Sequence, residues 1–405
     1  MNSSGPLQGY RIIEMASKGP GPLCGMLLAD MGAEVIRVER PGTQADVKAS
    51  REASSVINRN RRSVTLDLKQ PLARSAMLRM VATSDALIEG FRPGVMERLA
   101  LGPADCLRAN RRLVYGRVTG WGQTGPLALR AGHDINFLGL TGALHAIGPR
   151  DGAPVPPLNL VADYGGGAMF LAYGLVCGLL EAKASGQGQV IDVAMTDAVA
   201  SLMTAIHGLH NAQLWEDQRG SNLLDGGASF YGVHETRDGK FMAVGPIEPA
   251  FFAEFLRRLD LPASEFADRM NRVNWAKQGH LVRVAFRQKT RAEWELVFSE
   301  GDACVTPVLS LSEAPQHPHN VARGTFTQLD GVAQPAVAPR FSRTPGRLRS
   351  TPPKPGADGR EVLQSLGFTA SEIEQMLAGA QARGRNVDHE IALPEIMKEI
   401  AARSQ

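Results

Sequence analysis

The sequence has few cysteines, and they are far apart. Its 405 residues include four, at Cys24, Cys106, Cys177 and Cys304, with no CxxC pair among them. This spacing excludes the common structural zinc motifs and the disulfide framework of small secreted domains. We therefore expect thiols that pack as small apolar side chains in a reducing compartment.

A strong charge bias and a long apolar run are also lacking. The 44 basic and 41 acidic residues give a net charge of +3, which is no signature of nucleic-acid binding. The most apolar stretch, residues 168–180, is too short to cross a bilayer. The first eight residues do not follow the basic-then-apolar order of a secretory signal. We expect a cytoplasmic protein without nucleic-acid or membrane partners.

The first 200 residues alternate short apolar runs with helical patterns. Helix-like spacing of apolar residues covers 23–31 and 72–82, for example. The strand-like runs lie at residues 11–15, 33–38, 63–68, 85–89, 113–118 and 189–193. Strands that alternate with helices predict an α/β fold with a parallel, doubly wound sheet. We assign residues 1–200 to a large Rossmann-like domain.

The pattern changes in the second half of the chain. A hairpin is indicated at 231–244, and amphipathic stretches follow at 250–259 and 281–299. These features predict a smaller α+β domain over residues 225–325. We interpret residues 326–378 as a linker that returns to the large domain, and residues 379–405 as a C-terminal tail.

A glycine-rich turn follows the first predicted strand. Gly19-Pro-Gly-Pro-Leu-Cys-Gly25 is similar to a dinucleotide fingerprint, and Glu39 lies about 20 residues further on, where a ribose-binding acid is expected. The glycine spacing is one residue too long, however, and the prolines remove N–H donors that a pyrophosphate needs. A tight strand–helix turn is therefore favoured over NAD binding.

Arginines cluster near the ends of predicted strands. Arg37 and Arg92 lie near the ends of two strands, and Asn60-Arg-Arg-Ser63 precedes a third. Arginine can bind phosphates with two parallel hydrogen bonds, so these residues are candidates for an anion site. A solvated charged surface explains the same pattern.

The stretch from Gly132 to Gly167 carries the candidate acid–base chemistry. His133 follows a glycine-rich loop, and Asp163 precedes three glycines and an apolar helix. An aspartate at this place caps a helix or serves in catalysis, and bare N–H groups near the glycines could hold a developing oxyanion. A structural role is the simpler explanation for His133 alone.

Taken together, these residues resemble the type III CoA-transferase (CaiB/BaiF) superfamily, and within it the α-methylacyl-CoA racemases. The shared motifs include Gly19-Pro-Gly-Pro, Asn60-Arg-Arg-Ser, Gly132-His-Asp-Ile-Asn136, Asp163 with its glycines, and Gly245-Pro-Ile-Glu248-Pro. The resemblance implies two interlocked copies of the chain. It also implies an active site between the large domain of one copy and the small domain of the other.

The resemblance implies roles for three residues. His133 and Asp163 would be the acid–base pair that inverts the α-carbon of a 2-methylacyl-CoA thioester, and Glu248 would orient His133. The alternative is a CoA-transferase that forms an aspartyl anhydride at Asp163. No metal and no separate cofactor are implied, because CoA is part of the substrate. The residues implied to bind it are Arg37, Asn60, Arg61, Arg62, Ser63, Ser84, Asp85, Ala86, Arg92, Gly132, Asp134, Ile135, Asn136 and Phe137.

Overall fold

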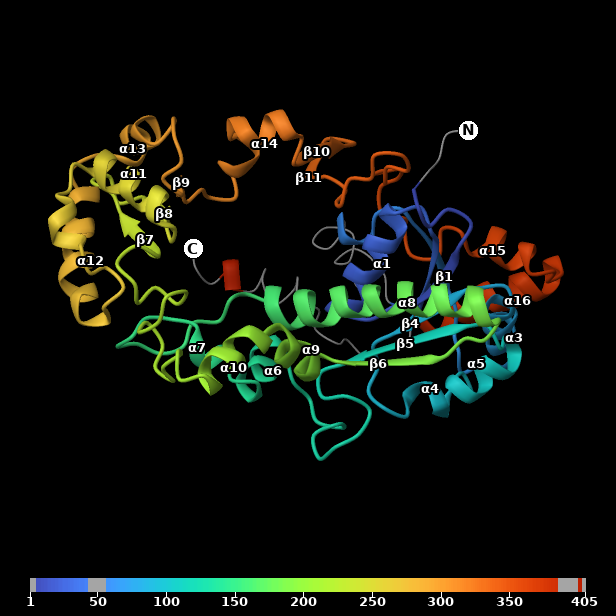
Figure 1. Ribbon diagram of the computed structural model, residues 1–405. Helices are drawn as coiled ribbons and strands as arrows, with labels where there is room; N and C mark the ends of the chain where they lie inside the picture. The colour runs from blue at the N-terminus through green and yellow to red at the C-terminus, as the bar shows by residue number, and fades with distance from the viewer. Residues whose placement is uncertain (1–4, 43–55, 385–399, 403–405) are drawn as a thin grey trace. The chain divides into compact units, whose positions relative to one another are not determined.

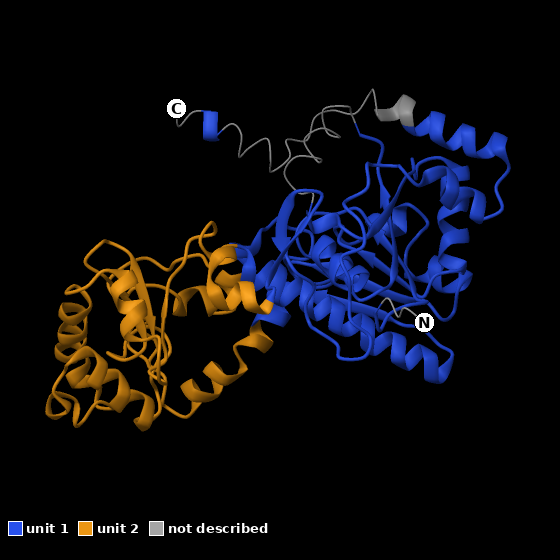
Figure 2. Cartoon of the chain, turned by 90° about the horizontal axis from the view of Figure 1, so that it is seen from above, with its two compact units in different colours: residues 1–137, 159–199, 324–405 blue, residues 138–158, 200–323 orange. Residues whose placement is uncertain are grey.

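The computed structural model describes residues 5–42, 56–384 and 400–402. The chain divides into two compact units, drawn in blue and orange in Figure 2. Unit 1 comprises residues 1–137, 159–199 and 324–405, and unit 2 comprises residues 138–158 and 200–323. This division differs from the expected domains at residues 138–158, which belong to the smaller unit although they lie within the first 200 residues.

Unit 1 contains a six-stranded sheet in the order β3-β2-β1-β4-β5-β6, and every neighbouring pair in it is parallel. Its strands are β1 (Arg11–Met15), β2 (Glu34–Glu39), β3 (Arg61–Thr65), β4 (Ala86–Glu89), β5 (Val114–Thr119) and β6 (Val190–Ala194). The prediction of a parallel α/β sheet is confirmed. The order reverses between β1 and β4, and ligands of open α/β sheets bind beyond the carboxyl ends of the strands at such a point.

Helices lie between these strands along the chain, and α9 follows the last strand (Figure 1). They are α1 (Pro20–Asp30), η1 (Val56–Asn58), α3 (Pro71–Ala82), α4 (Val95–Arg98), α5 (Pro103–Ala109), α6 (Asp134–Leu140), η2 (Leu160–Met169), α8 (Phe170–Ser185) and α9 (Met195–Leu202). Three of them, α1, α3 and α5, begin at a proline, which suits the first helical turn because its N–H groups have no partner there.

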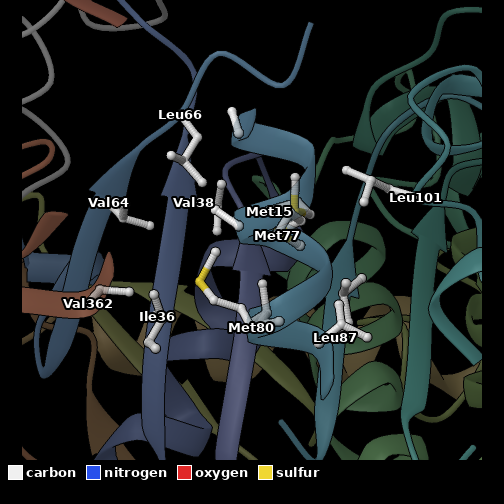
Figure 3. Close-up of a cluster of buried hydrophobic side chains, with 14 of the residues drawn as sticks. Met15, Ile36, Val38, Val64, Leu66, Met77, Met80, Leu87, Leu101 and Val362 are labelled. Atoms are coloured by element: carbon white, nitrogen blue, oxygen red, sulfur yellow. The ribbon is translucent and has the colours of Figure 1, made fainter. Parts of the chain in front are cut away.

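The C-terminal segment completes unit 1. A hairpin of β10 (Phe326–Leu329) and β11 (Val332–Pro335) precedes α15 (Gly359–Ser365) and α16 (Ala370–Gly384). Val362 of α15 joins the same core cluster as Met15, Met77 and Leu87 (Figure 3). Burying one such side chain stabilises a fold by about 1.5–3 kcal/mol. Residues 359–378 are therefore part of the large core, which corrects their assignment to a linker.

The helices η2 and α8 form one continuous apolar stretch. Residues Leu160–Ser185 are long and apolar enough, by length and composition alone, to cross a membrane. A core helix of a soluble α/β unit can have the same length and apolar composition. Here the side chains of Leu171 and Leu175 are fully buried, and both contact the position of Gly116 in β5. We therefore interpret the stretch as a core helix of unit 1.

Unit 2 has a three-stranded antiparallel sheet in the order β7 (Gly232–Glu235), β8 (Phe241–Val244), β9 (Val305–Pro307). Its helices are α7 (Ala143–Ala146), α10 (Thr204–Asn211), α11 (Pro249–Leu259), η3 (Ala263–Phe266), α12 (Arg272–Phe286), α13 (Arg291–Val297), η4 (Ala314–Gln316) and α14 (Pro318–Arg323). The hairpin is confirmed. The amphipathic stretch 281–299 is two helices rather than one, because Thr290 forms a capping box with Glu293 that starts α13.

The predicted tail, residues 379–405, begins inside α16, which ends at Gly384. Most of its remaining residues lie outside the described part of the chain.

Candidate active site

The glycine turn after β1 lies against the carboxylate of Asp163. Gly19 has a φ of 71°, in the left-handed region that favours glycine, and α1 begins at the next residue. A Cβ atom on Gly19 would lie 3.3 Å from Asp163 Oδ2. This turn lies at the carboxyl end of β1, where the strand order reverses. Glycine is therefore required here by the backbone and by the close approach of the carboxylate.

Asp163 occupies a π-helix, a rare conformation that is often found at functional sites. Its carboxylate is half-buried, and Oδ2 accepts a hydrogen bond of 3.4 Å from the side-chain amide of Asn159. Burial raises the pKa of Asp163, and the charge of Asp134 raises it further, while Asn159 and His133 lower it. The net effect moves this carboxyl toward the range in which a group can exchange protons near neutral pH.

His133 lies immediately before α6 and is exposed. Its backbone is held by Asn136, whose Oδ1 accepts the His133 N–H at 3.0 Å and whose N–H donates to the His133 carbonyl at 2.8 Å. The next residue, Asp134, is buried, and its Oδ2 accepts hydrogen bonds from the N–H groups of Ala162 and Asp163, at 2.9 and 2.8 Å. Asp134 thus connects the start of α6 to η2, and His133 is near enough for its charge to lower the pKa of Asp163.

The same bonds correct one expectation about the oxyanion. The N–H of Asp163 donates to Asp134 and so is not free to hold a thioester oxygen. The glycines after Asp163 serve packing instead. A Cβ atom on Gly167 would lie 2.7 Å from the side chain of Pro20, and one on Gly166 would lie 3.3 Å from Val199. These two glycines allow η2 to lie close to α1 and α9.

Two of the residues implied to bind CoA shape the His133 loop instead. The Phe137 side chain is 4% exposed, and its ring packs edge-on against Trp121 at a centroid distance of 4.8 Å. A Cβ atom on Gly132 would lie 2.7 Å from the Phe137 ring. Gly132 and Phe137 are therefore packing residues. Ile135 is 45% exposed, and Asn136 is exposed while it holds the His133 backbone.

Arg37 and Arg61 are committed to internal ion pairs. The buried Glu14 binds both of them, through Arg61 Nε at 2.6 Å and through Arg37 Nη1. Arg37 also pairs with Glu39 at 3.1 Å, and Arg61 donates to the backbone carbonyls of Ile57 and Pro22. The Arg61 side chain is fully buried, so a phosphate does not reach it. The expectation that Arg61 contacts CoA is corrected.

Asn60, Arg62 and Ser63 hold the C-terminal segment. Asn60 Oδ1 accepts the N–H groups of Arg349 and Ser350 at 2.6 and 3.0 Å, and Ser63 Oγ accepts that of Gly356 at 2.8 Å. Arg62 pairs with Glu34, Asp358 and Glu361. These residues lie at the amino half of β3, opposite the ligand-binding edge. Their assignment to CoA is corrected, because their polar groups dock residues 349–361.

The segment Ser84–Ala86 lies at the amino end of β4. Ser84 Oγ donates to the carbonyl of Met80, Asp85 Oδ2 accepts the N–H of Arg11, and Ala86 is fully buried. Arg92 follows the carboxyl end of the same strand and is exposed. Because Ser84–Ala86 and Arg92 lie at opposite ends of β4, they do not belong to one binding site at a sheet edge. Arg92 keeps its place as a candidate phosphate ligand, and Ser84, Asp85 and Ala86 do not.

Three further exposed cations at the carboxyl edge were not among the residues expected to bind CoA. Lys18 follows β1, Arg40 follows β2 and Lys69 follows β3, and all three are exposed. The signal that could have found them is a basic residue within four positions of the end of a predicted strand.

Glu248 lies in unit 2, whereas His133 and Asp163 lie in unit 1. It is exposed and precedes α11 as the N-terminal cap residue, with Pro249 as the first helical residue. Among the described residues, no group of three or more His, Cys, Asp or Glu side chains is placed to hold a metal ion.

Comparison with known proteins adds family information to this geometry. The profile of CoA-transferase family III matches residues 7–359. The α-methylacyl-CoA racemase of Mus musculus is 44% identical over 372 residues, covering 91% of this chain and 96% of the relative. The racemase of Homo sapiens is 42% identical over 373 residues, with the same coverage. A CaiB/BaiF family protein from Brucella suis matches in fold, with a TM-score of 0.77, 24% identity, and coverage of 90% of this chain and 100% of that one.

Proposed function

Because the chain belongs to CoA-transferase family III, we propose that it is an isomerase that inverts the α-carbon of 2-methylacyl-CoA thioesters. The observation that carries the proposal is the pairing of two proton-transfer groups. His133 precedes a residue that hydrogen-bonds the backbone of Asp163, and the charge of His133 acts on the Asp163 carboxyl. Inversion needs one group to remove the α-proton and a second group to return a proton to the opposite face.

In the proposed reaction, His133 removes the α-proton of one epimer and Asp163 that of the other. A planar enolate forms between the two transfers. Ordinary pKa values, near 6.5 for histidine and near 3.9 for aspartate, are poorly matched for such work. Burial raises the pKa of Asp163 and so narrows the difference between the ordinary pKa values of the two residues. Since the N–H of Asp163 is taken by Asp134, the enolate oxygen must find its donors elsewhere in the site.

Binding of the CoA part is assigned to the carboxyl edge of the sheet. Arg92 is exposed there and is available for phosphate, and no cofactor beyond the CoA of the substrate is proposed. Arg37 lies in the same strand-end region, but Glu14 and Glu39 already balance its charge. We therefore assign Arg92 the larger share of phosphate binding.

We further propose that the protein works as a homodimer and that Glu248 orients the imidazole of His133. The division of candidate residues between the two units supports this proposal, because a site completed by both units can be assembled from two copies. Large apolar side chains on one face of η2 and α8, namely Met169, Tyr173 and Leu180, are exposed and suit an interface. The chain's mass in solution, measured by light scattering, tests the dimer.

The reaction is tested by following exchange of the α-proton of (R)- and (S)-2-methylacyl-CoA with deuterated solvent. General acid–base groups contribute about 10²–10⁴-fold to a rate. We expect His133→Ala and Asp163→Asn each to slow epimerisation at least about hundredfold. Each variant should retain residual exchange only with the epimer whose proton faces the remaining base.

His145→Ala is the matched control, because His145 is an exposed histidine that pairs with Asp217 in unit 2. Epimerisation at the wild-type rate in His133→Ala would contradict the proposal.

A CoA-transferase remains the second candidate, because the same family profile covers it and Asp163 is a half-buried carboxylate at the right place for an acyl anhydride. Treatment with hydroxylamine in the presence of acyl-CoA should then modify Asp163, and CoA should move to an added carboxylic acid. Rapid α-proton exchange without any such transfer favours the isomerase.

A further inference from the structure

The loop that carries Glu248 is held by a small number of backbone contacts within unit 2. It joins β8 to α11 and comprises residues 245–248. The N–H of Gly245 donates to the carbonyl of Cys304 at 2.9 Å, and the N–H of Ile247 donates to the carbonyl of Gly245 at 3.0 Å. Glu248 itself is exposed at the end of this loop. The direction of its carboxylate therefore depends on how firmly the backbone at Ile247 is held.

One side chain from outside the loop binds at this point. Arg269 Nη2 donates to the carbonyl of Ile247 at 2.6 Å. The guanidinium lies over two aromatic rings, with its central carbon 4.6 Å from the centre of Phe230 and 4.5 Å from that of Phe252. Both rings are buried, so they restrict the guanidinium to one position.

The backbone of Arg269 is also held. Its carbonyl accepts the indole N–H of Trp275 at 2.7 Å, and the Trp275 ring packs edge-on against Phe230. Arg269 is thus held at its backbone by Trp275 and at its guanidinium by two phenylalanines. Because Arg269 is fixed at its backbone and at its guanidinium, it also fixes the group that it binds, the carbonyl of Ile247, which directly precedes Glu248.

One further observation connects Arg269 to Glu248 directly. Burial lowers the pKa of Arg269, and the charge of Glu248 acts on the guanidinium in the opposite direction. In addition, Arg269 Nη1 is buried and has no hydrogen-bond partner. This N–H group is not bonded to Glu248, so the inference rests on the bond to the Ile247 carbonyl and on the charge of Glu248.

From these contacts we infer that Arg269 is a positioning residue for Glu248. It holds the carbonyl of Ile247, and its positive charge draws the Glu248 carboxylate to one side of the loop. The inference rests on the proposed function, in which Glu248 orients His133. Arg269 does not touch the substrate in this account. Its loss is therefore expected to lower kcat while the KM for the thioester, which depends on the CoA contacts of unit 1, stays within about twofold.

Three substitutions separate the parts of this role. Arg269→Met removes the charge and the hydrogen bond, and small misplacements of a positioned group can cost up to about hundredfold, so we expect kcat to fall about 10- to 100-fold. Arg269→Gln keeps one hydrogen-bond donor for the Ile247 carbonyl but removes the charge. Arg269→Lys keeps the positive charge but places it on a single ammonium group. Both should recover part of the loss. The matched control is Arg272→Met, because Arg272 also donates to a backbone carbonyl, that of Leu214, and lies near an aromatic ring, that of Trp275.

The decisive measurement is a double-mutant cycle on α-proton exchange with Arg269→Met and Glu248→Gln. If Arg269 acts through Glu248, its replacement lowers kcat in the wild type and has little further effect in the Glu248→Gln background. An equal loss in both backgrounds, or no loss in either, would overturn the inference. If Arg269→Met does not fold by circular dichroism, the cycle is run with Arg269→Gln. Wild-type exchange in Glu248→Gln refutes the role of Glu248 itself, and so identifies a failure of the proposed function.

Discussion

His234 gives unit 2 a pH dependence that can be measured. It lies on β7 and is only 7% exposed, and both of its ring nitrogens are buried without a hydrogen-bond partner. Its imidazole stacks on Phe286 with a centroid distance of 5.3 Å and an interplanar angle of 7°. Burial, with a smaller contribution from the charge of Arg283, lowers the pKa of His234 from 6.5 to about 4. The folded unit therefore holds the neutral imidazole.

The direction of the effect follows from the lowered pKa. Above pH 6.5 the imidazole is neutral in both the folded and the unfolded chain, and the histidine adds no pH dependence. As the pH falls from 6.5 toward 4, the unfolded chain takes up a proton that the folded unit refuses, so stability is lost. One pKa unit is worth about 1.4 kcal/mol, so the loss reaches about 2 kcal/mol at pH 5 and about 3 kcal/mol at pH 4.

Replacing the histidine by phenylalanine removes this loss. His234→Phe keeps a flat ring against Phe286 and has no nitrogen to protonate. The free energy of unfolding of unit 2 is measured by urea titration with tryptophan fluorescence, because Trp275 and Trp294 belong to its core. The difference between variant and wild type should grow by about 3 kcal/mol from pH 7.5 to pH 4. His280→Phe serves as the control, because His280 is exposed on α12. A difference that stays constant with pH would refute the reasoning.

Four further predictions follow from the residues of unit 1. Asp134→Asn removes the charge that helps to raise the pKa of Asp163, so the acid limb of the pH profile of kcat should move to lower pH. Asp134→Ala should also speed hydrogen exchange at residues 158–166, because two N–H groups lose their acceptor. Asn60→Ala removes the acceptor of two N–H groups in the C-terminal segment and should speed hydrogen exchange at residues 347–352 by about tenfold, with the sheet unchanged. Arg92→Ala should raise the KM for the thioester about tenfold with no loss of stability. Arg61→Ala should lower the free energy of unfolding, measured by urea titration, by about 3–5 kcal/mol, because Glu14 loses a buried partner.

Much of the fold of unit 1 could be predicted from local patterns. Short apolar runs correctly located all six strands of the parallel sheet; the first strand matches at both ends, and the ends of the others differ by at most three residues. Such runs are informative because a parallel strand covered on both faces must be apolar throughout. The C-terminal helices α15 and α16 lie in the segments assigned to a linker and a tail, and their place in the large core was not predicted. Their contacts join residues almost 300 positions apart, which no local pattern contains.

The site was predicted unevenly for a related reason. The catalytic roles of His133 and Asp163 stay a prediction. The structure connects their backbones through Asp134, and the two residues lie within about 30 positions of sequence. The arginine block at Asn60–Ser63 was assigned to CoA because its residue types suit phosphate. In the structure the same residues bind carboxylates and backbone groups of the chain itself. A guanidinium binds a phosphate and a carboxylate with the same geometry, so its residue type does not identify its partner.

The sequence by itself determined the six strands of the parallel sheet, the hairpin of unit 2 and the family that the chain resembles. The tertiary structure alone decided which polar groups remain available for a ligand. Asp134 illustrates the difference: its carboxylate could have faced a substrate, but folding places it against the N–H groups of Ala162 and Asp163. The physical reason is that most buried polar groups are hydrogen-bonded, and the partner comes from whichever distant segment the fold brings beside them.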